Sequence, residues 1–199
     1  MNDKTKAKTK AALLFLDIDD VLCLNLPYGG YDSLAVVRGQ DSDAMTVFAG
    51  LFEPRACQAL KQVHEAMNGE LHYVISSTWR EFFDRAQMDR VFRASGLGFV
   101  ADALHDELRW CTPPSFGRSR RIDDIASWLD RHHQGEPFAI VDDMLSGPSL
   151  KPALSNAAHP FAGRVVLCQE FVGLLDEHVG TIVDALGRAA PGAPEEGAR

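Results

Sequence analysis

The chain has 199 residues, of which 46% are hydrophobic and 24% are charged, as expected for one folded globular domain with a sizeable core. Its formal net charge of -8 argues against a broad nucleic-acid-binding surface, which would be basic, but leaves room for a local phosphate site. Its four cysteines are scattered without Cys-x-x-Cys spacing, so we expect reduced thiols rather than disulfides or a zinc site. Neither a signal peptide nor a membrane span is evident, and the cytoplasm is the expected location.

The two ends of the chain differ in composition from the middle. Residues 1–11 are basic and predict a mobile tail, and residues 188–199 are rich in Ala, Pro, Gly and Glu and predict a disordered one. Residues 12–187 then form one domain, because no repeat or long linker divides them. Within it, residues 24–52 are broken up by glycines and a proline, which predicts a small inserted flap of loops with room for a hairpin.

The first strong feature is an apolar run, residues 13–16, that leads directly into Asp17, Asp19 and Asp20. Such a run predicts a buried strand, and open α/β sheets bind ligands at the carboxyl ends of their strands. Crowded carboxylates repel one another and lose hydration. A metal and reaction centre at Asp17 and Asp19 is therefore favoured over an Asp-rich turn whose side chains cap their own backbone.

Helices and strands alternate beyond the flap. Pro54 opens a helix, and the later pattern predicts strands at 71–75, 138–141 and 164–168 and helices at about 80–94, 121–131 and 172–187. The signal is weak between 97 and 117, where Phe99 and Val100 suggest a short strand. This alternation predicts an α/β fold of three layers, α/β/α, with a parallel sheet as the middle layer.

Polar clusters follow three of the predicted strands: Asp17 with Asp19, Ser76 with Ser77, and Asp142 with Asp143. Parallel strands would bring these clusters to one edge of the sheet. The acids there would hold a hard divalent cation through oxygen ligands, with Mg²⁺ the expected ion, and serine donors would bind phosphoryl oxygens. One carboxylate beside the cation could attack phosphorus and another could donate a proton. Alternatively, the serines cap the next helix and the last acidic pair forms a turn.

Three of these stretches resemble sequence motifs of the haloacid dehalogenase-like (HAD) superfamily. Residues 15–22 (FLDIDDVL) resemble its first motif in the phosphatase form, residues 74–80 (VISSTWR) its second and residues 138–143 (FAIVDD) its fourth. The second motif and a later Arg121-x-x-Asp124 pattern are similar to the HAD domains of bacterial RNA-repair (Swiss Army Knife) proteins. The resemblance implies a Rossmann-like core and a Mg²⁺-dependent phosphatase that acts through an aspartyl-phosphate. It also implies a nucleotide or nucleic-acid-end phosphate as the substrate.

The resemblance also implies roles for the acidic residues. Asp17 corresponds to the nucleophile, and Asp19 to the general acid and base, whose main-chain carbonyl joins Asp17 on Mg²⁺. Asp142 corresponds to the metal ligand of the fourth motif. Asp143 corresponds to a ligand through water or to a support for Asp142.

The phosphate-binding positions are less well defined. Ser76 is the first polar residue after its strand and is preferred as the side-chain phosphate ligand, with Ser77 contributing its amide, although a one-residue shift reverses them. The lysine usual in the third motif is missing, and Arg121 aligns best in its place. An arginine fork can neutralise phosphoryl oxygens but is no equivalent of lysine. Other arginines also compete for this position: Arg118, Arg120 and Arg80.

Two further functions fit part of the sequence. The missing lysine leaves open a catalytically silent module that binds metal or phosphate at the acidic edge. A receiver-like phospho-acceptor domain also has an acidic cluster after its first strand, but here the strand at 71–75 ends in serine rather than an acceptor aspartate. The small flap suits a large phosphoester or a covering second chain, and Trp79 and Trp128 are interpreted as packing residues.

Overall fold

The computed structural model describes residues 10–40, 43–114 and 120–188. The expected tails lie almost entirely outside these ranges, as does Arg118. Four strands form a single sheet in the order β2-β1-β3-β4 with every neighbouring pair parallel. The strands are β1 (Ala12–Leu16), β2 (Leu71–Ile75), β3 (Phe138–Asp143) and β4 (Val165–Cys168). All four predicted strands are therefore confirmed.

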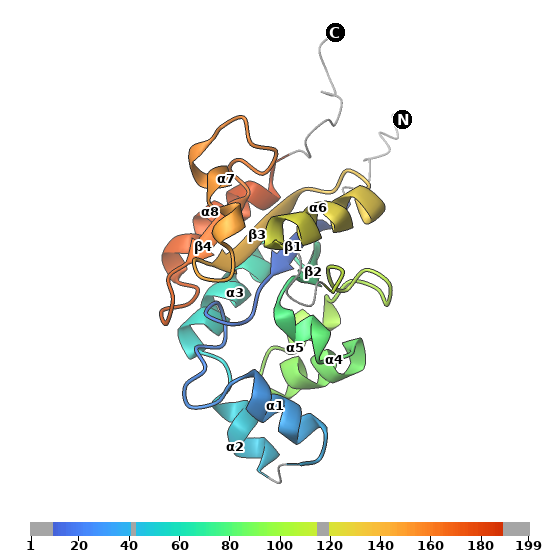
Figure 1. Cartoon of the computed structure of the whole chain (residues 1–199), viewed down its shortest axis with the longest axis vertical. Coiled ribbons are helices and arrows are strands. Elements are labelled where there is room, and N and C mark those ends of the chain that lie inside the picture. The colour runs from blue at the N-terminus through green and yellow to red at the C-terminus, as the bar shows by residue number, and fades with distance from the viewer. Residues whose placement is uncertain (1–9, 41–42, 115–119, 189–199) are drawn as a thin grey trace, which may run out of the picture.

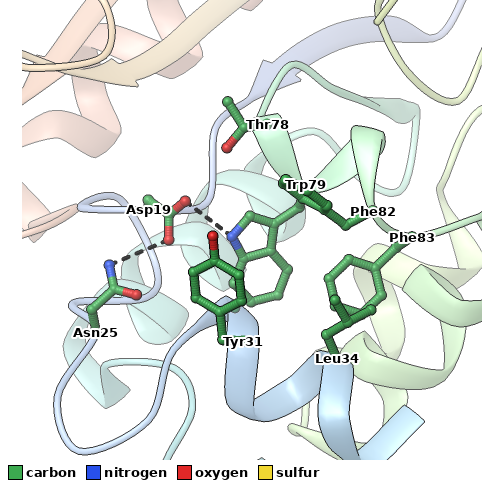
Figure 2. A pocket seen from close by; sticks show the side chains of 9 residues that line it. Asp19, Asn25, Tyr31, Leu34, Thr78, Trp79, Phe82 and Phe83 are labelled. Atoms are coloured by element: carbon green, nitrogen blue, oxygen red, sulfur yellow. Dashed lines mark hydrogen bonds between the residues drawn. The ribbon is translucent and has the colours of Figure 1, made fainter. Parts of the chain in front are cut away.

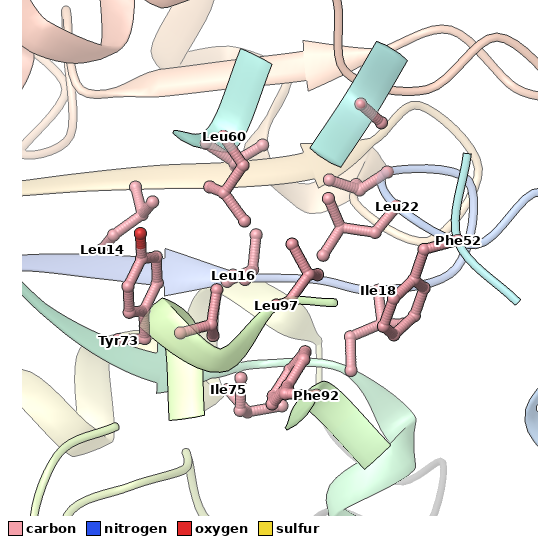
Figure 3. Close-up of a cluster of buried hydrophobic side chains, with 14 of the residues drawn as sticks. Leu14, Leu16, Ile18, Leu22, Phe52, Leu60, Tyr73, Ile75, Phe92 and Leu97 are labelled. Atoms are coloured by element: carbon pink, nitrogen blue, oxygen red, sulfur yellow. The ribbon is translucent and has the colours of Figure 1, made fainter. Parts of the chain in front are cut away.

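Side chains of β1 alternate between two hydrophobic cores, one on each face of the sheet. Leu14 and Leu16 belong to the larger core, drawn in Figure 3, and Leu13 and Phe15 belong to the smaller one. This alternation follows from the two-residue repeat of a strand. Since both faces are apolar, both must be covered, and this is why the run reads as continuously hydrophobic.

Helices cover both faces of the sheet (Figure 1). The larger core is closed by α3 (Pro54–Ala66) and α8 (Asp176–Leu186), and it extends to α4 (Arg85–Ala94) and α5 (Gly98–Asp102) beside β2. The smaller core is closed by α6 (Arg121–His132), the short 3-10 turn η2 (Pro148–Leu150) and α7 (Pro152–Ser155). The predicted three-layer α/β/α architecture is therefore confirmed.

The flap contains helices instead of loops or a hairpin. Within residues 24–52 the structure has α1 (Gly30–Val37) and α2 (Ala44–Ala49), which pack on each other and on α4 at one end of the molecule (Figure 1). The glycines that suggested turns lie at helix ends: Gly29 and Gly50 are cap residues, and Gly39 has a positive φ of 71°. At Gly39, just after α1, glycine is favoured because it tolerates left-handed backbone.

Three other boundaries differ from the sequence prediction. Phe99 and Val100 lie in α5 and not in a strand. The predicted 80–94 helix is divided into the 3-10 turn η1 (Thr78–Glu81) and α4, because Asp84 accepts the N–H of Gln87 and caps a new helix. The last helix begins at Asp176 instead of 172, since the chain before it includes positive φ angles at residues 171 and 173.

Two exclusions drawn from composition can be compared with the structure. All four cysteines are free, so the prediction of unpaired thiols is confirmed. Cys23 and Cys168 are buried and the other two are partly buried. In the described ranges, no helix has both the length and the apolar character needed to cross a bilayer.

Candidate active site

The register of the sheet brings three strand ends to the same level. Leu16 of β1 pairs with Ile75 of β2 on one side and with Val141 of β3 on the other. The next residues along these strands are Asp17, Ser76 and Asp142, each almost completely buried. The predicted convergence of the acidic and serine clusters on one edge is therefore what the fold produces.

Three carboxylates form a compact cluster at this edge. Asp17, Asp142 and Asp143 each offer an oxygen, and these oxygens lie within 4.8 Å of one another. Each residue also has a buried Oδ2 atom with no hydrogen-bond partner among the described residues. Asp143 is held in place through Oδ1, which accepts the backbone N–H groups of Leu145 and Ser146 at 2.5 and 2.8 Å. An all-oxygen donor set with unpartnered atoms fits Mg²⁺.

Electrostatics in the cluster favour a cation. Burial raises the pKa of Asp17 to about 6, against an opposing effect of Arg121, and the nearby Asp19 and Asp143 raise it further. Burial also raises the pKa of Asp142, with Asp17 as the next cause. Carboxylates that are both desolvated and close to one another are costly to ionise, and a bound divalent ion removes that cost.

We expect Mg²⁺ to stabilise the fold, and more so at higher pH. The folded-state pKa of Asp17, about 6, lies above the ordinary value of 3.8, so the folded state binds this proton more tightly. The metal-free protein should therefore lose stability as the pH rises from the ordinary pKa of 3.8 through the folded-state pKa of about 6. Mg²⁺ at about 100 times its Kd should add about 2.7 kcal/mol.

Thermal melts with Mg²⁺ or with EDTA, at about pH 5 and about pH 7.5, measure this effect. The increase in Tm should be larger at the higher pH, where the ligands are ionised. Asp142→Asn should reduce the increase at both. A Tm that does not change on adding Mg²⁺ at the higher pH would contradict a metal site at this cluster.

Among the arginines in the described ranges, Arg121 is paired with the carboxylates of Asp17 and Asp142. It begins α6 and is 8% exposed, with Nη2 3.3 Å from Asp17 Oδ1 and Nε 2.8 Å from Asp142 Oδ2. The second contact is an ion pair without hydrogen-bond alignment. Burial lowers the pKa of Arg121, but the surrounding carboxylates outweigh it and the net shift is upward, so the guanidinium stays charged. Arg120 instead lies on the surface, paired with Asp123.

Arg80, a candidate for the cation opposite Asp17, lies instead at the end of β2. Its Nη1 donates to the carbonyl oxygens of Ser76 and Ser77 at 2.7 and 2.6 Å. Its Nη2 donates to Asp124 Oδ2 at 2.8 Å and to the Pro113 carbonyl at 3.2 Å. The guanidinium therefore holds the end of β2 in place, and none of its described hydrogen bonds reaches Asp17.

The two serines differ in their surroundings. The Ser77 hydroxyl lies beside Asp17 and lowers the pKa of that carboxyl, opposing the larger effect of burial. The Ser77 side chain also accepts the N–H of Trp79 at 3.4 Å and caps η1, so the capping role is real. The Ser76 hydroxyl is buried without a hydrogen-bond partner in the described ranges. The Ser77 hydroxyl, rather than that of Ser76, therefore influences the pKa of Asp17.

The carboxylate of Asp19 lies outside the three-acid cluster. Its Oδ1 accepts from Asn25 Nδ2 at 3.3 Å and its Oδ2 from Trp79 Nε1 at 3.0 Å (Figure 2). Burial raises the pKa of Asp19, and these two hydrogen bonds oppose the shift. A carboxyl with a raised pKa keeps a proton more readily, as a general acid requires.

Trp79 was interpreted from sequence as a packing residue, and it has a second role. The ring does pack, 5.4 Å from Phe83, but its N–H is directed at Asp19. Its position two residues after the serine cluster, close to a strand end, is the signal that could have identified it. Trp128, in contrast, is a packing residue that lies 5.2 Å from Phe15.

Two further residues shape the edge and were not predicted. Asp20 adopts a positive φ of 54° and accepts the N–H of Phe171 at 2.9 Å, so it ties the loop after β1 to the loop after β4. A Cβ on Gly147 would lie 2.8 Å from the carbonyl oxygen of Asp143 and 3.0 Å from Asp142 Oδ1. Glycine is therefore needed where the chain passes the acidic cluster.

A parallel α/β sheet with an aspartate cluster after its first strand, serines after the second and two aspartates at the end of the third defines a HAD-like domain. Over residues 13–179 the chain matches the family described as the HAD domain in Swiss Army Knife RNA repair proteins, and it belongs to that family. No curated protein and no solved structure matches the chain. Membership of a HAD family supports a phosphatase-type hydrolase.

Proposed function

We propose that the protein is a Mg²⁺-dependent phosphomonoesterase that works through an aspartyl-phosphate on Asp17. The observation that carries the proposal is the surroundings of that carboxylate. Asp17 lies within one buried cluster with Asp142 and Asp143, next to the guanidinium of Arg121. A nucleophilic carboxylate can approach a phosphate only where positive charge offsets their repulsion.

The metal ligands in this proposal are the side chains of Asp17 and Asp142, the main-chain carbonyl of Asp19, and Asp143 directly or through water. When bound, Mg²⁺ would neutralise charge on the attacking carboxylate and on the phosphoryl oxygens. Arg121, at the start of α6, would add positive charge beside Asp17, and its guanidinium fork suits phosphoryl oxygens. The Ser77 hydroxyl, which lowers the pKa of Asp17, is the favoured side-chain ligand of the phosphoryl group, with Ser76 as the alternative.

Two chemical steps follow from these positions. An oxygen of Asp17 bonds to phosphorus while the bond from phosphorus to the leaving oxygen breaks, and Asp19 gives that oxygen its proton. Asp19, now a carboxylate, then takes a proton from water as the water attacks the aspartyl-phosphate. Inorganic phosphate leaves and Asp17 is restored. The raised pKa of Asp19 supports its part in the first step.

The family description supports a nucleotide or a nucleic-acid end as the substrate. Recognition would have to be local, because the net charge of -8 disfavours a broad contact with a polyanion. A cytoplasmic location stays a prediction.

The test is release of inorganic phosphate from nucleotides, sugar phosphates and 3′- or 5′-phosphorylated oligonucleotides, with Mg²⁺ or with EDTA. We expect Mg²⁺-dependent release, and preference for oligonucleotide ends would support the repair-like assignment. Preference for sugar phosphates would count against that assignment. Mg²⁺ binding without turnover of any substrate would favour the silent module.

Replacing the acid, Asp19→Asn, should slow turnover in a way that depends on the leaving group. For an alkyl phosphate we expect a loss of about 10²- to 10⁴-fold, since the alcohol must be protonated as it leaves. For p-nitrophenyl phosphate the loss in the first step should be much smaller, because nitrophenolate leaves without a proton. Burst kinetics isolate that step. Asp184→Asn, an exposed change on α8, is the control, and equal losses on both substrates would contradict the role of Asp19.

A further inference from the structure

A pocket of about 190 Å³ adjoins the Asp19 carboxylate (Figure 2). It lies between the flap and the loop that follows β2. Its nine lining residues are Asp19, Asn25, Gly30, Tyr31, Leu34, Thr78, Trp79, Phe82 and Phe83. The flap thus contributes one wall of a cavity that begins at the proposed proton donor.

We propose that this pocket binds the leaving group of the substrate, and that the leaving group carries an uncharged, planar aromatic ring. The inference rests on the proposed phosphatase function and names the class of phosphoester it would take. A nucleoside base and a simple aryl group share this chemistry.

Position is the first reason. In phosphoryl transfer the attacking and leaving oxygens lie roughly in line on opposite sides of phosphorus. The leaving oxygen must also come within hydrogen-bond reach of Asp19, which protonates it. With Asp17 on one side, the rest of the leaving group therefore extends past Asp19, and the pocket begins there.

The chemistry of the walls is the second reason. Four of the lining residues are aromatic, and none of the nine is lysine or arginine. The Trp79 ring also packs against other rings, with its centroid 5.4 Å from that of Phe83 and 6.3 Å from that of Phe52. Flat apolar walls bind a flat ring by stacking, whereas a second phosphate would meet a carboxylate and no cation.

Exposure and size are the third reason. Tyr31 is 83% exposed and Phe82 48% exposed, which is unusual for large side chains that share one cavity. Sites that enclose drug-sized ligands measure about 300–1,000 Å³. The smaller volume here suits one ring system and not a longer stretch of nucleic acid.

Trp79 connects the pocket to the chemistry. Its ring is a wall of the pocket, and its N–H donates to Asp19. The flap helix lies close against this ring, because a Cβ on Gly30 would be 3.0 Å from the indole. A ring bound on the indole would therefore hold the acid and the flap in place together, and Trp79 acts as a positioning residue.

The first experiment compares kcat/KM for phenyl phosphate, a nucleoside monophosphate and glycerol phosphate in wild type, Tyr31→Ala and Met45→Ala. Tyr31→Ala should lower kcat/KM about tenfold for the aromatic substrates and about twofold at most for glycerol phosphate. Met45, 85% exposed on the flap and outside the pocket, is the matched control and should change neither. A loss for both aromatic substrates assigns the pocket to a base as well as an aryl ring, and a loss for phenyl phosphate alone assigns it to a ring bonded directly to the ester oxygen. Equal losses on all three substrates, or none, would overturn the proposal.

The second experiment separates the pocket from the phosphatase function. The indole N–H resonance of Trp79, assigned with Trp79→Phe, is followed while adenosine or phenol is added to the wild type and to Tyr31→Ala. A shift in the wild type that is weaker in Tyr31→Ala supports the pocket, even if the protein releases no phosphate from any substrate. Phosphate release without preference for aromatic substrates, and without such a shift, would overturn the pocket and leave the phosphatase function standing.

Discussion

Asp17→Asn is expected to abolish phosphate release, by about 10³-fold or more, while the fold is retained. The amide has nearly the same shape as the carboxylate but is a poor nucleophile and a weaker metal ligand. In the absence of metal the variant should be more stable than the wild type near neutral pH. The reason is that burial raises the pKa of Asp17 to about 6, so ionising this carboxyl costs folding free energy.

Three measurements check this expectation. Phosphate release gives the loss of activity, and denaturant titration in EDTA gives the gain in stability. Acid quenching of the wild type during turnover should trap phosphate on the protein, and the variant should trap none. Turnover by Asp17→Asn at the wild-type rate would remove Asp17 from the nucleophile's role.

The sequence was most informative where local pattern and sheet geometry coincide. The runs before Asp17 and Asp142 are apolar on both faces and form the two central strands, and the run before Ser76 forms β2, which pairs with β1. Parallel strands that end at the same level must present the residues that follow them together. The acidic cluster could be predicted for this reason, without knowledge of any helix position.

The arginines could not be separated in this way. Arg80, Arg120 and Arg121 all lie near predicted strand ends or helix starts, and their charges are alike. Arg121 reaches Asp17 because α6 begins at this residue and packs on the smaller core. Arg80 instead binds at the end of β2, where the Ser76 and Ser77 carbonyls and Asp124 accept its hydrogen bonds. Only tertiary packing distinguishes these roles.

The flap shows a second limit of local pattern. Its glycines and proline are typical of turns, yet Gly29 and Gly50 cap two short helices whose apolar residues, such as Leu34 and Phe48, pack into the larger core. Helices of this length depend on tertiary contacts for most of their stability. The pocket beside Asp19 exists because those helices form, and it could not be predicted from the sequence.

Arg80→Ala should have the largest effect on stability, because it removes the buried guanidinium that donates to Asp124 and to two strand-end carbonyls. We expect a loss of about 3–5 kcal/mol in the free energy of unfolding. Arg80→Lys should recover only part of it, since an ammonium group cannot bridge the Ser76 and Ser77 carbonyls and Asp124 as the guanidinium fork does. Denaturant titration of both variants measures the losses. Arg93→Ala, which removes an exposed arginine paired with Asp89 and Asp102, is the control and should change stability little.

The same variants test whether Arg80 also positions the phosphate site. In Arg80→Lys, the increase of Tm on adding Mg²⁺ should persist, because none of the described hydrogen bonds of Arg80 reaches the acidic cluster. The kinetic comparison is made at a temperature where this variant is still folded. KM for a phosphoester should rise, because the serine carbonyls that Arg80 braces set the position of the Ser77 hydroxyl beside Asp17. A variant that loses stability but keeps the wild-type KM would show that Arg80 serves the fold alone. A simultaneous loss of the Mg²⁺ response would mean instead that the end of β2 and the metal cluster form one cooperative unit.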